Sequence, residues 1–425
     1  MELTLGRSSF PRALYLALAL AAVMPAAPVA ATATADDAAL AHARALLARV
    51  AFVDGHNDLP WTIREAAASN LESYDLRSRR EKGDTDLPRL REGLVRGQFW
   101  SVWIPSGLER PARTQLEQID LARRMIAMHS DTLLFATRAA DVERARTTGT
   151  IASFLGMENG QALENSLGAL RAYYDLGVRY MTLTHGRNND WADSATDTPA
   201  HGGLTPFGRE VVREMNRLGM LVDLSHVAPA VMHQALDVSA APVIFSHSSA
   251  RALVDHPRNV PDDVLARIRK NGGVVMVTFI PPFVSAETAA WGKGLESLIF
   301  NTKTTAEMEA MEAEYAKAHG PAPHATLAQV ADHIEHVARV AGNDHVGIGS
   351  DFWGSPDMPD GLADVSRFPD LFAELIRRGW SDENLTKLAG GNIVRTLAAA
   401  ETVAARLQKE RPASTATIEA LDGKK

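Results

Sequence analysis

The strongest constraint on the fold is an alternation between short apolar runs and longer amphipathic stretches along the chain. Near-continuous apolar runs are typical of parallel strands that are buried on both faces. Because helical patterns separate the runs, the sequence predicts an α/β fold whose strands close into a (β/α)8 TIM barrel. The expected strands are Val50–Asp54, Phe99–Ile104, Ile151–Met157, Tyr180–Thr184, Met220–Leu224, Pro242–Ser246, Gly273–Thr278 and His345–Ser350.

An open, doubly wound sheet is the competing architecture. Such a sheet usually carries a glycine-rich phosphate turn after its first strand. Here that position reads Asp54-Gly55-His56-Asn57-Asp58, which has no such turn. Two long connections, Thr62–Arg96 and Ile280 to about Pro323, interrupt the repeat, and connections of this length usually form lids or oligomer contacts.

The first 35 residues have the three-part layout of a secretory signal peptide. Arg7 and Arg12 precede an apolar run over residues 13–23, which is too short for a comfortable membrane span. We therefore expect a cleaved signal peptide, a secreted or periplasmic protein and no membrane span in the mature chain; a retained N-terminal anchor is the alternative. Residues 36–410 are expected to form a single barrel domain, followed by a disordered tail over 411–425.

Cysteine is absent, which limits the chemistry open to the chain. Disulfides, thiolate ligands and a cysteine nucleophile are all excluded. Any zinc must be held by His, Asp and Glu, which is more typical of catalytic than of structural sites. The formal net charge of −8 and the lack of a basic cluster argue against a nucleic-acid partner.

Histidines and acidic residues follow six of the eight expected strands. Catalytic groups gather at the carboxyl ends of barrel strands, so we expect these side chains to face one bowl. A capping role would explain any one of them, but coincidence across six strands is a poor explanation for the set. They are His56 and Asp58 after the first strand, Glu158 after the third, His185 after the fourth, His226 after the fifth, His247 after the sixth and Asp351 after the eighth.

The pattern favours two metal ions over one. His56 and Asp58 alternate as they leave their strand and can reach one ion, whereas His226 and His247 end adjacent strands and suit another. Glu158 has two oxygens with which to bridge ions ~3.5–4 Å apart. A bridging carbamylated lysine is excluded, because the fourth strand and its surroundings contain no lysine.

Several motifs together resemble the renal (membrane) dipeptidase family, zinc peptidases of the amidohydrolase type. The resemblance runs in order from about Phe52 to Thr396 and covers nearly the whole mature chain. The motifs are Val53-Asp54-Gly55-His56-Asn57-Asp58-Leu59-Pro60, Leu183-Thr184-His185, Phe245-Ser246-His247-Ser248-Ser249-Ala250, Arg258-Asn259-Val260-Pro261-Asp262 and Gly347-Ile348-Gly349-Ser350-Asp351-Phe352.

The resemblance implies a dipeptidase with two Zn²⁺ per chain that uses a metal-bridging hydroxide. His56 and Asp58 would then bind one zinc, His226 and His247 the other, and Glu158 would bridge them. The implied substrates are dipeptides, including some with a D-residue at the second position, and some β-lactams.

The resemblance also implies roles for three further side chains. His185 would contact the substrate near the scissile carbonyl, where a donor stabilises the developing oxyanion. Arg258 would pair with the C-terminal carboxylate of the substrate. Asp351 would accept a proton from the bridging water and pass it to the leaving amine. The simpler alternatives are a strand-end cap for His185 and a surface charge for Arg258.

The chain departs from the family pattern at two positions. Asn159 replaces the glycine that usually follows the bridging acid, and Trp353 replaces the usual acid after Asp351-Phe352, which reshapes the pocket rim. Mammalian members are disulfide-linked dimers, so without cysteine a homodimer would be non-covalent.

Two other functions compete with dipeptide hydrolysis. A related amidohydrolase could act on N-acyl amino acids or lactones, which need no recognition of a free amine. A catalytically inactive periplasmic binding protein on the same scaffold would be expected to lose a ligand or the proton shuttle, yet every predicted ligand and Asp351 are present.

Overall fold

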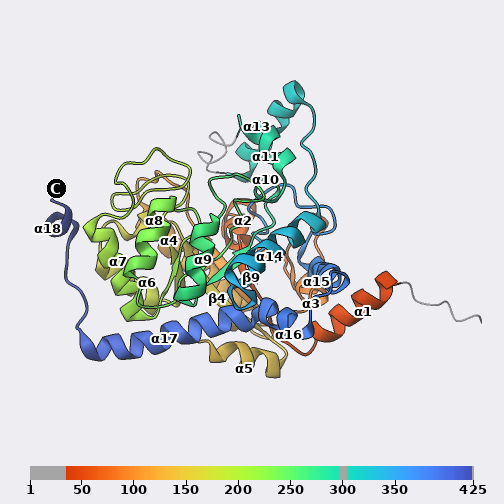
Figure 1. Cartoon of the computed structure of the whole chain (residues 1–425), viewed down its shortest axis with the longest axis horizontal. Coiled ribbons are helices and arrows are strands. Elements are labelled where there is room, and N and C mark those ends of the chain that lie inside the picture. Colours follow the sequence, from red (N-terminus) through yellow and green to blue (C-terminus); the bar gives the residue numbers. More distant parts are fainter. Residues whose placement is uncertain (1–34, 296–303, 424–425) are drawn as a thin grey trace, which may run out of the picture.

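The computed structural model describes residues 35–295 and 304–423, so the predicted signal peptide lies almost wholly outside the described residues. Parallel strands close into an eight-stranded barrel surrounded by helices, which confirms the predicted TIM barrel (Figure 1). Around the barrel the order is β2-β1-β9-β8-β7-β6-β5-β4, and β2 pairs with β4 to close it. These strands are β1 (Phe52–Asn57), β2 (Val95–Trp103), β4 (Ile151–Glu158), β5 (Val178–Thr182), β6 (Leu221–Asp223), β7 (Ile244–Phe245), β8 (Val274–Val277) and β9 (Val346–Ile348).

A ninth strand, β3 (Leu133–Phe135), was not predicted from the sequence. It pairs with the first three residues of β4, on the edge that β5 occupies from Leu155 onward. A strand of three residues is too short to give a periodic signal, so only the pairing with β4 identifies it.

Helices cover the outside of the barrel, and their ends follow local sequence rules. In α7 (Pro206–Leu218), the Thr205 side chain caps the amino end, and Gly219 ends the helix with a left-handed φ of 85°. The other helices of the barrel domain are α1 (Ala35–Leu47), α2 (Leu59–Ala67), α3 (Leu87–Glu92), α4 (Pro111–Met128), α5 (Ala140–Thr148), α6 (Leu167–Asp175), α8 (Pro229–Val238), α9 (Asp262–Asn271), α14 (Leu327–Ala341), α15 (Phe368–Arg377), α16 (Asp382–Thr386) and α17 (Asn392–Glu410).

The amino end of the barrel is sealed by apolar packing. Inward side chains such as Phe99, Phe154 and Met276 form one buried cluster with Leu397 of α17 and Val142 of α5. This packing leaves the carboxyl ends of the strands as the open end of the barrel, where a site can form.

The connection after β8 contains three helices, α10 (Pro281–Val284), α11 (Ala286–Gly292) and α13 (Thr305–His319). They stand together on the side of the molecule opposite α17 (Figure 1). Among the residues that the structure describes, no helix is both long enough and apolar enough to cross a membrane.

The chain after residue 410 does not match the predicted disorder. It forms a short helix, α18 (Ile418–Asp422), whose Ile418 is buried. The Asp422 carboxylate accepts a hydrogen bond from the backbone N–H of Phe207 at 2.9 Å, which fixes the tail at the start of α7. This contact could not be predicted from the sequence, because it joins residues 215 positions apart.

Candidate metal centre

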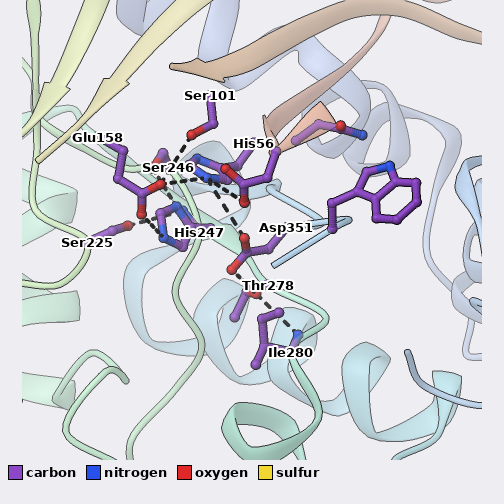
Figure 2. A network of polar contacts seen from close by, with 12 residues as sticks. His56, Ser101, Glu158, Ser225, Ser246, His247, Thr278, Ile280 and Asp351 are labelled. Carbon is purple, nitrogen blue, oxygen red and sulfur yellow. Dashed lines mark hydrogen bonds and ion pairs between the residues drawn. The ribbon is translucent and has the colours of Figure 1, made fainter. Parts of the chain in front are cut away.

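Glu158, the last residue of β4, lies at the centre of the bowl and is almost fully buried. Its Oε2 is 3.3 Å from His56 Nε2, whereas its Oε1 is 2.9 Å from His226 Nε2 and 3.4 Å from His247 Nε2. Figure 2 shows the carboxylate pointing toward His56 and His247. The two oxygens of one carboxylate therefore face two separate groups of nitrogen donors.

The first group consists of His56, Asp58 and Oε2 of Glu158. His56 Nε2 lies 3.5 Å from Asp58 Oδ2, and both this nitrogen and Asp58 Oδ1 are buried without a hydrogen-bond partner among the described residues. Burial opposes a charge on His56, but Tyr180, Glu158 and Asp58 outweigh it and raise the pKa of His56 well above its usual value. This half of the bowl attracts a cation.

The second group consists of His226, His247 and Oε1 of Glu158. The Nε2 atoms of the two histidines are 2.9 Å apart and both face the same carboxylate oxygen. Burial lowers the pKa of both rings well below the usual value, which favours neutral rings with free lone pairs. Burial also opposes ionisation of Glu158, but His56 and hydrogen bonds from His226 and His247 hold its pKa well below the usual range.

Hydroxyl groups lie behind the rings of His56 and His247 and contact their Nδ1 atoms. Tyr180 OH lies 2.7 Å from His56 Nδ1 and 3.3 Å from the Gly55 carbonyl, so it can accept from Nδ1 while it donates to that carbonyl. Ser246 Oγ donates to Asp223 at 2.5 Å and therefore accepts from His247 Nδ1 at 2.8 Å. A neutral ring whose Nδ1 proton is held in this way can offer the lone pair of its Nε2 to a bound metal ion.

Asp223 is a buried carboxylate whose partners among the described residues are four hydrogen-bond donors. It accepts from the hydroxyls of Thr182 and Ser246 and from the backbone N–H groups of Ser225 and Ser246. A carboxylate with four donors is held rigidly, so it orients Ser246 and, through it, the imidazole of His247.

These donor sets suit metal ions. In each of the two groups the ligand atoms lie within 4.8 Å of one another, all from buried histidine or carboxylate side chains. Imidazole and carboxylate are the ligands of catalytic zinc sites, and a buried cluster of this kind needs a cation to balance it. His56, Asp58, Glu158, His226 and His247 are thus brought together as the sequence predicted.

Asp351 lies on the open side of the first group. Its Oδ1 is 3.8 Å from His56 Nε2, and its Oδ2 accepts from Thr278 Oγ1 at 3.4 Å. Burial raises the pKa of this carboxyl well above its usual value; His56 opposes the shift, and Asp58 and Glu158 reinforce it. Asp351 can therefore hold a proton beside the first group of candidate ligands.

His185 and Arg258 also face the bowl. His185 Nε2 is 3.8 Å from Glu158 Oε1, and burial lowers the pKa of the ring. The Arg258 guanidinium is buried, donates to the carbonyl of His247 at 3.2 Å and to Ser248 Oγ at 3.4 Å, and borders the same pocket. The alternative that Arg258 is a surface charge is wrong.

The two departures from the family pattern have clear local structures. Asn159 adopts a φ of 95°, a region that glycine enters freely and that asparagine tolerates better than most residues. Its amide also donates to the Ile104 carbonyl. Trp353 borders the pocket, as expected, and its backbone N–H donates to Asp84.

Sequence reasoning missed the residues behind the ligands. Tyr180, Asp223 and Ser246 lie inside or at the end of expected strands, and Ser101 Oγ donates to Glu158 Oε2 at 3.1 Å. One signal for them was present in the sequence. Asp223 is an acidic residue within the apolar strand that contains Leu221, and a buried carboxylate needs hydrogen-bond donors around it.

A closed barrel with histidines and carboxylates gathered around one central acid defines a metal-dependent hydrolase. The model of the membrane dipeptidase family (peptidase family M19) matches residues 40–411. The chain belongs to this family of metallopeptidases, and it is a hydrolase that acts on dipeptides.

Solved structures of family members share the fold. A probable dipeptidase, PvdM, from Pseudomonas aeruginosa is 26% identical with a TM-score of 0.74, over 86% of this chain and 99% of that one. Dipeptidase AC, a metallopeptidase of family M19, is 27% identical with a TM-score of 0.68, over 83% and 98%. A metallopeptidase from Rhodobacter sphaeroides, bound to a phosphinate mimic of the dipeptide L-Ala-D-Ala, is 25% identical with a TM-score of 0.68, over 83% and 99%.

Proposed function

We propose that this protein is an exported, two-zinc dipeptidase. His56 and Asp58 hold one ion, His226 and His247 hold the other, and Glu158 bridges the pair. The proposal rests on the position of the Glu158 carboxylate. Its Oε2 faces His56 and its Oε1 faces His226 and His247, at 2.9–3.4 Å. A single four-ligand site would leave one of these groups without a role.

Ions held by these residues would supply Lewis acidity for the scissile carbonyl and would lower the pKa of a bound water. Asp351 receives the proton released by the attacking water and delivers it to the leaving amine, acting first as base and then as acid. Its position beside His56, with one oxygen on Thr278, supports this role. His185 donates a hydrogen bond to the oxygen of the carbonyl under attack.

Arg258 binds the C-terminal carboxylate of the dipeptide. Its guanidinium is already oriented by the His247 carbonyl and by Ser248, so little side-chain freedom is lost when the substrate binds. Buried at the side of the pocket, the charge favours a small substrate that ends in a free carboxylate. This recognition favours dipeptides over longer peptides.

We also propose that the enzyme accepts D-residues at the second position and some β-lactams. Support for the D-residue comes from the Rhodobacter sphaeroides metallopeptidase, whose bound phosphinate mimics L-Ala-D-Ala. The measurement is the kcat/KM for L-Ala-D-Ala against L-Ala-L-Ala, together with hydrolysis of a β-lactam panel.

A metal count combined with a substrate comparison tests the central proposal. Elemental analysis is expected to find two zinc ions per chain, and exhaustive chelation is expected to abolish hydrolysis until zinc is restored. A dipeptide with a free amine is expected to be hydrolysed faster than its N-acetyl form. Full activity after chelation would overturn the metal mechanism, and faster turnover of the acetylated substrate would favour the amidohydrolase alternative.

Export and assembly are tested separately. We propose that the chain is cleaved after a signal peptide that ends near residue 35 and that any homodimer is non-covalent, because cysteine is absent. Amino-terminal sequencing of the exported protein and light scattering of the purified protein are the measurements. A mature protein that still begins at Met1 would overturn the proposed cleavage and would favour a retained N-terminal anchor.

A further inference from the structure

The imidazole of His333, in α14, joins two segments of backbone that lie on either side of it. The Ala250 N–H donates to His333 Nδ1 at 3.0 Å. Because a backbone N–H can only donate, Nδ1 carries the lone pair and the ring proton lies on Nε2, which donates to the Val284 carbonyl at 3.3 Å. The ring is buried, and burial lowers the pKa of His333 to about 4, so the neutral ring persists at neutral pH. One side chain therefore ties the backbone of Ala250 to that of Val284.

The first of these segments carries Arg258. Ala250 lies near the start of the connection between β7 and α9, and Arg258 follows in the same connection. Val260, just beyond Arg258, pairs with Ala250 in a parallel bridge through backbone hydrogen bonds of 2.8 and 3.0 Å. The imidazole therefore holds the base of the loop that carries Arg258.

The second segment is α10, which packs against the Arg258 side chain. The Phe283 ring centroid lies 5.3 Å from the carbon of the Arg258 guanidinium, and both side chains border the active-site pocket. The Asn259 amide donates to the Phe283 carbonyl at 2.9 Å, so α10 and the loop of Arg258 are in direct contact. Val284, the next residue of α10, is the one whose carbonyl accepts from His333.

His333 supports this contact from behind. Val284 and His333 line the groove on the outside of the barrel, whereas Phe283 and Arg258 line the active-site pocket. A group that binds substrate must be held within about 0.5 Å of its productive position by the residues packed around it. A displacement of about 1 Å caused by a residue that does not touch the substrate can cost about 100-fold in rate.

We propose that His333 is a positioning residue for recognition of the substrate's C-terminal carboxylate. By fastening the loop of Arg258 to α10, its imidazole holds the guanidinium in the place where that carboxylate binds. The proposal rests on the proposed function, in which Arg258 binds the carboxylate of the dipeptide. Loss of the His333 contacts should therefore weaken binding of substrates with a free carboxylate and should affect substrates without one much less.

The experiment compares L-Ala-L-Ala with its C-terminal amide, which lacks the carboxylate. In the zinc-loaded wild type, kcat/KM for the free dipeptide is expected to exceed that for the amide by at least about 10-fold, because hydrogen bonds to a charged group are lost in the amide. His333→Leu loses both contacts and is expected to lower this ratio by about 5-fold or more, through a higher KM for the free dipeptide and an unchanged kcat. The ratio cancels any general loss of active enzyme.

Two polar variants separate the contacts of His333. His333→Asn keeps an oxygen for the Ala250 N–H but is too short to reach the Val284 carbonyl, and it is expected to lower the ratio by about 2-fold to 3-fold. His333→Gln keeps an acceptor and a donor and is expected to retain the wild-type ratio. Because His333→Asn leaves the Ala250 N–H paired, it decides the question if His333→Leu does not fold.

His345→Leu is the matched control, because His345 Nδ1 contacts the Gly273 carbonyl at 2.8 Å at the amino ends of β8 and β9, away from Arg258. This variant is expected to keep the wild-type ratio. An unchanged ratio in both His333→Leu and His333→Asn would overturn the proposal, as would an equal fall in His345→Leu or a ratio in His333→Gln as low as in His333→Leu.

Failure of the proposed function gives different results. A wild type that hydrolyses L-Ala-L-Ala without preferring the free carboxylate would overturn the role of Arg258 and this proposal together, and would leave the dipeptidase standing. Absence of any hydrolysis of L-Ala-L-Ala by the zinc-loaded wild type would refute the proposed function itself.

Discussion

Among the described residues, two regions are rich in histidine, and they differ in how the ring nitrogens are used. At the metal centre, the Nε2 atoms of His56, His226 and His247 converge on the Glu158 carboxylate. In a groove on the outside of the barrel, lined partly by α14, His333 and His336 lie one helical turn apart.

The outer histidines are fully used by the protein itself. His333 Nδ1 accepts from the Ala250 N–H at 3.0 Å, and its Nε2 lies 3.3 Å from the Val284 carbonyl. His336 contacts Asp262 through Nε2 and Arg339 through Nδ1, both at 2.7 Å. The outer rings contact separate groups, whereas the Nε2 atoms of the centre converge on one carboxylate, and this convergence distinguishes a candidate metal site from a region that is only rich in histidine.

The largest expected effect comes from removing the bridge. Glu158→Gln should bind fewer than two zinc ions and lose about 10³-fold or more in kcat/KM, because each ion contributes several kcal/mol to the transition state. Elemental analysis and steady-state kinetics are the measurements. Glu335→Gln, in the outer groove, is the control and should keep both ions. If Glu158→Gln bound two zinc ions, as the control does, Glu158 would not be needed for metal binding and the proposed difference between the two regions would be wrong.

Asp351→Asn separates proton transfer from metal binding at the same centre. We expect both ions to remain and kcat to fall by at least ~10²-fold, the range for a removed general acid–base. Near-normal turnover would remove Asp351 from the mechanism. Loss of metal would instead identify Asp351 as a ligand. Metal content should therefore be measured, because Asp351 lies close enough to His56 and His247 to share an ion with them.

Tyr180→Phe tests the relay behind His56. Without the hydroxyl, Nδ1 loses its acceptor and the ring is no longer held in the tautomer that presents Nε2 to the ion. Zinc affinity, measured by competition with a chelator, should weaken by about 10-fold to 100-fold. Tyr173→Phe is the matched control, because its buried hydroxyl donates to the Ala162 carbonyl, outside the metal centre. Equal affinities in the two variants would show that the relay is irrelevant to metal binding.

A substitution in the outer groove is expected to have the smallest effect on the metal centre. Burial lowers the pKa of His333 from 6.5 to about 4. Between these values the unfolded chain binds more protons than the folded protein, so stability falls as the pH decreases from about 6.5 to about 4.

His333→Gln retains an acceptor and a donor but does not titrate. Over that pH range the wild type should lose roughly 3 kcal/mol more unfolding free energy than the variant. The measurement is chemical denaturation at several pH values. Zinc content should not change in the variant; a loss of zinc would show that the groove and the metal centre are coupled.

The sequence predicted the barrel because its strands are apolar runs that repeat regularly. It predicted that the histidines and carboxylates lie close together because barrel strands end at one rim. It did not reveal β3, which is too short to show a period, or α18, which depends on a contact with α7. The relays through Tyr180 and Asp223 were also missed. They join residues of different strands, and only the register of the sheet brings their side chains together.

The backbone at two positions of the centre has a consequence for protein engineering. His226 and Asp351 have φ angles of 67° and 66°, in the left-handed region that costs most residues about 1–2 kcal/mol. Glycine at position 226 would relieve that strain and remove a proposed ligand. Selecting variants of this enzyme for thermal stability alone would therefore enrich stable but inactive variants. Variants should be screened for activity first and for melting temperature second.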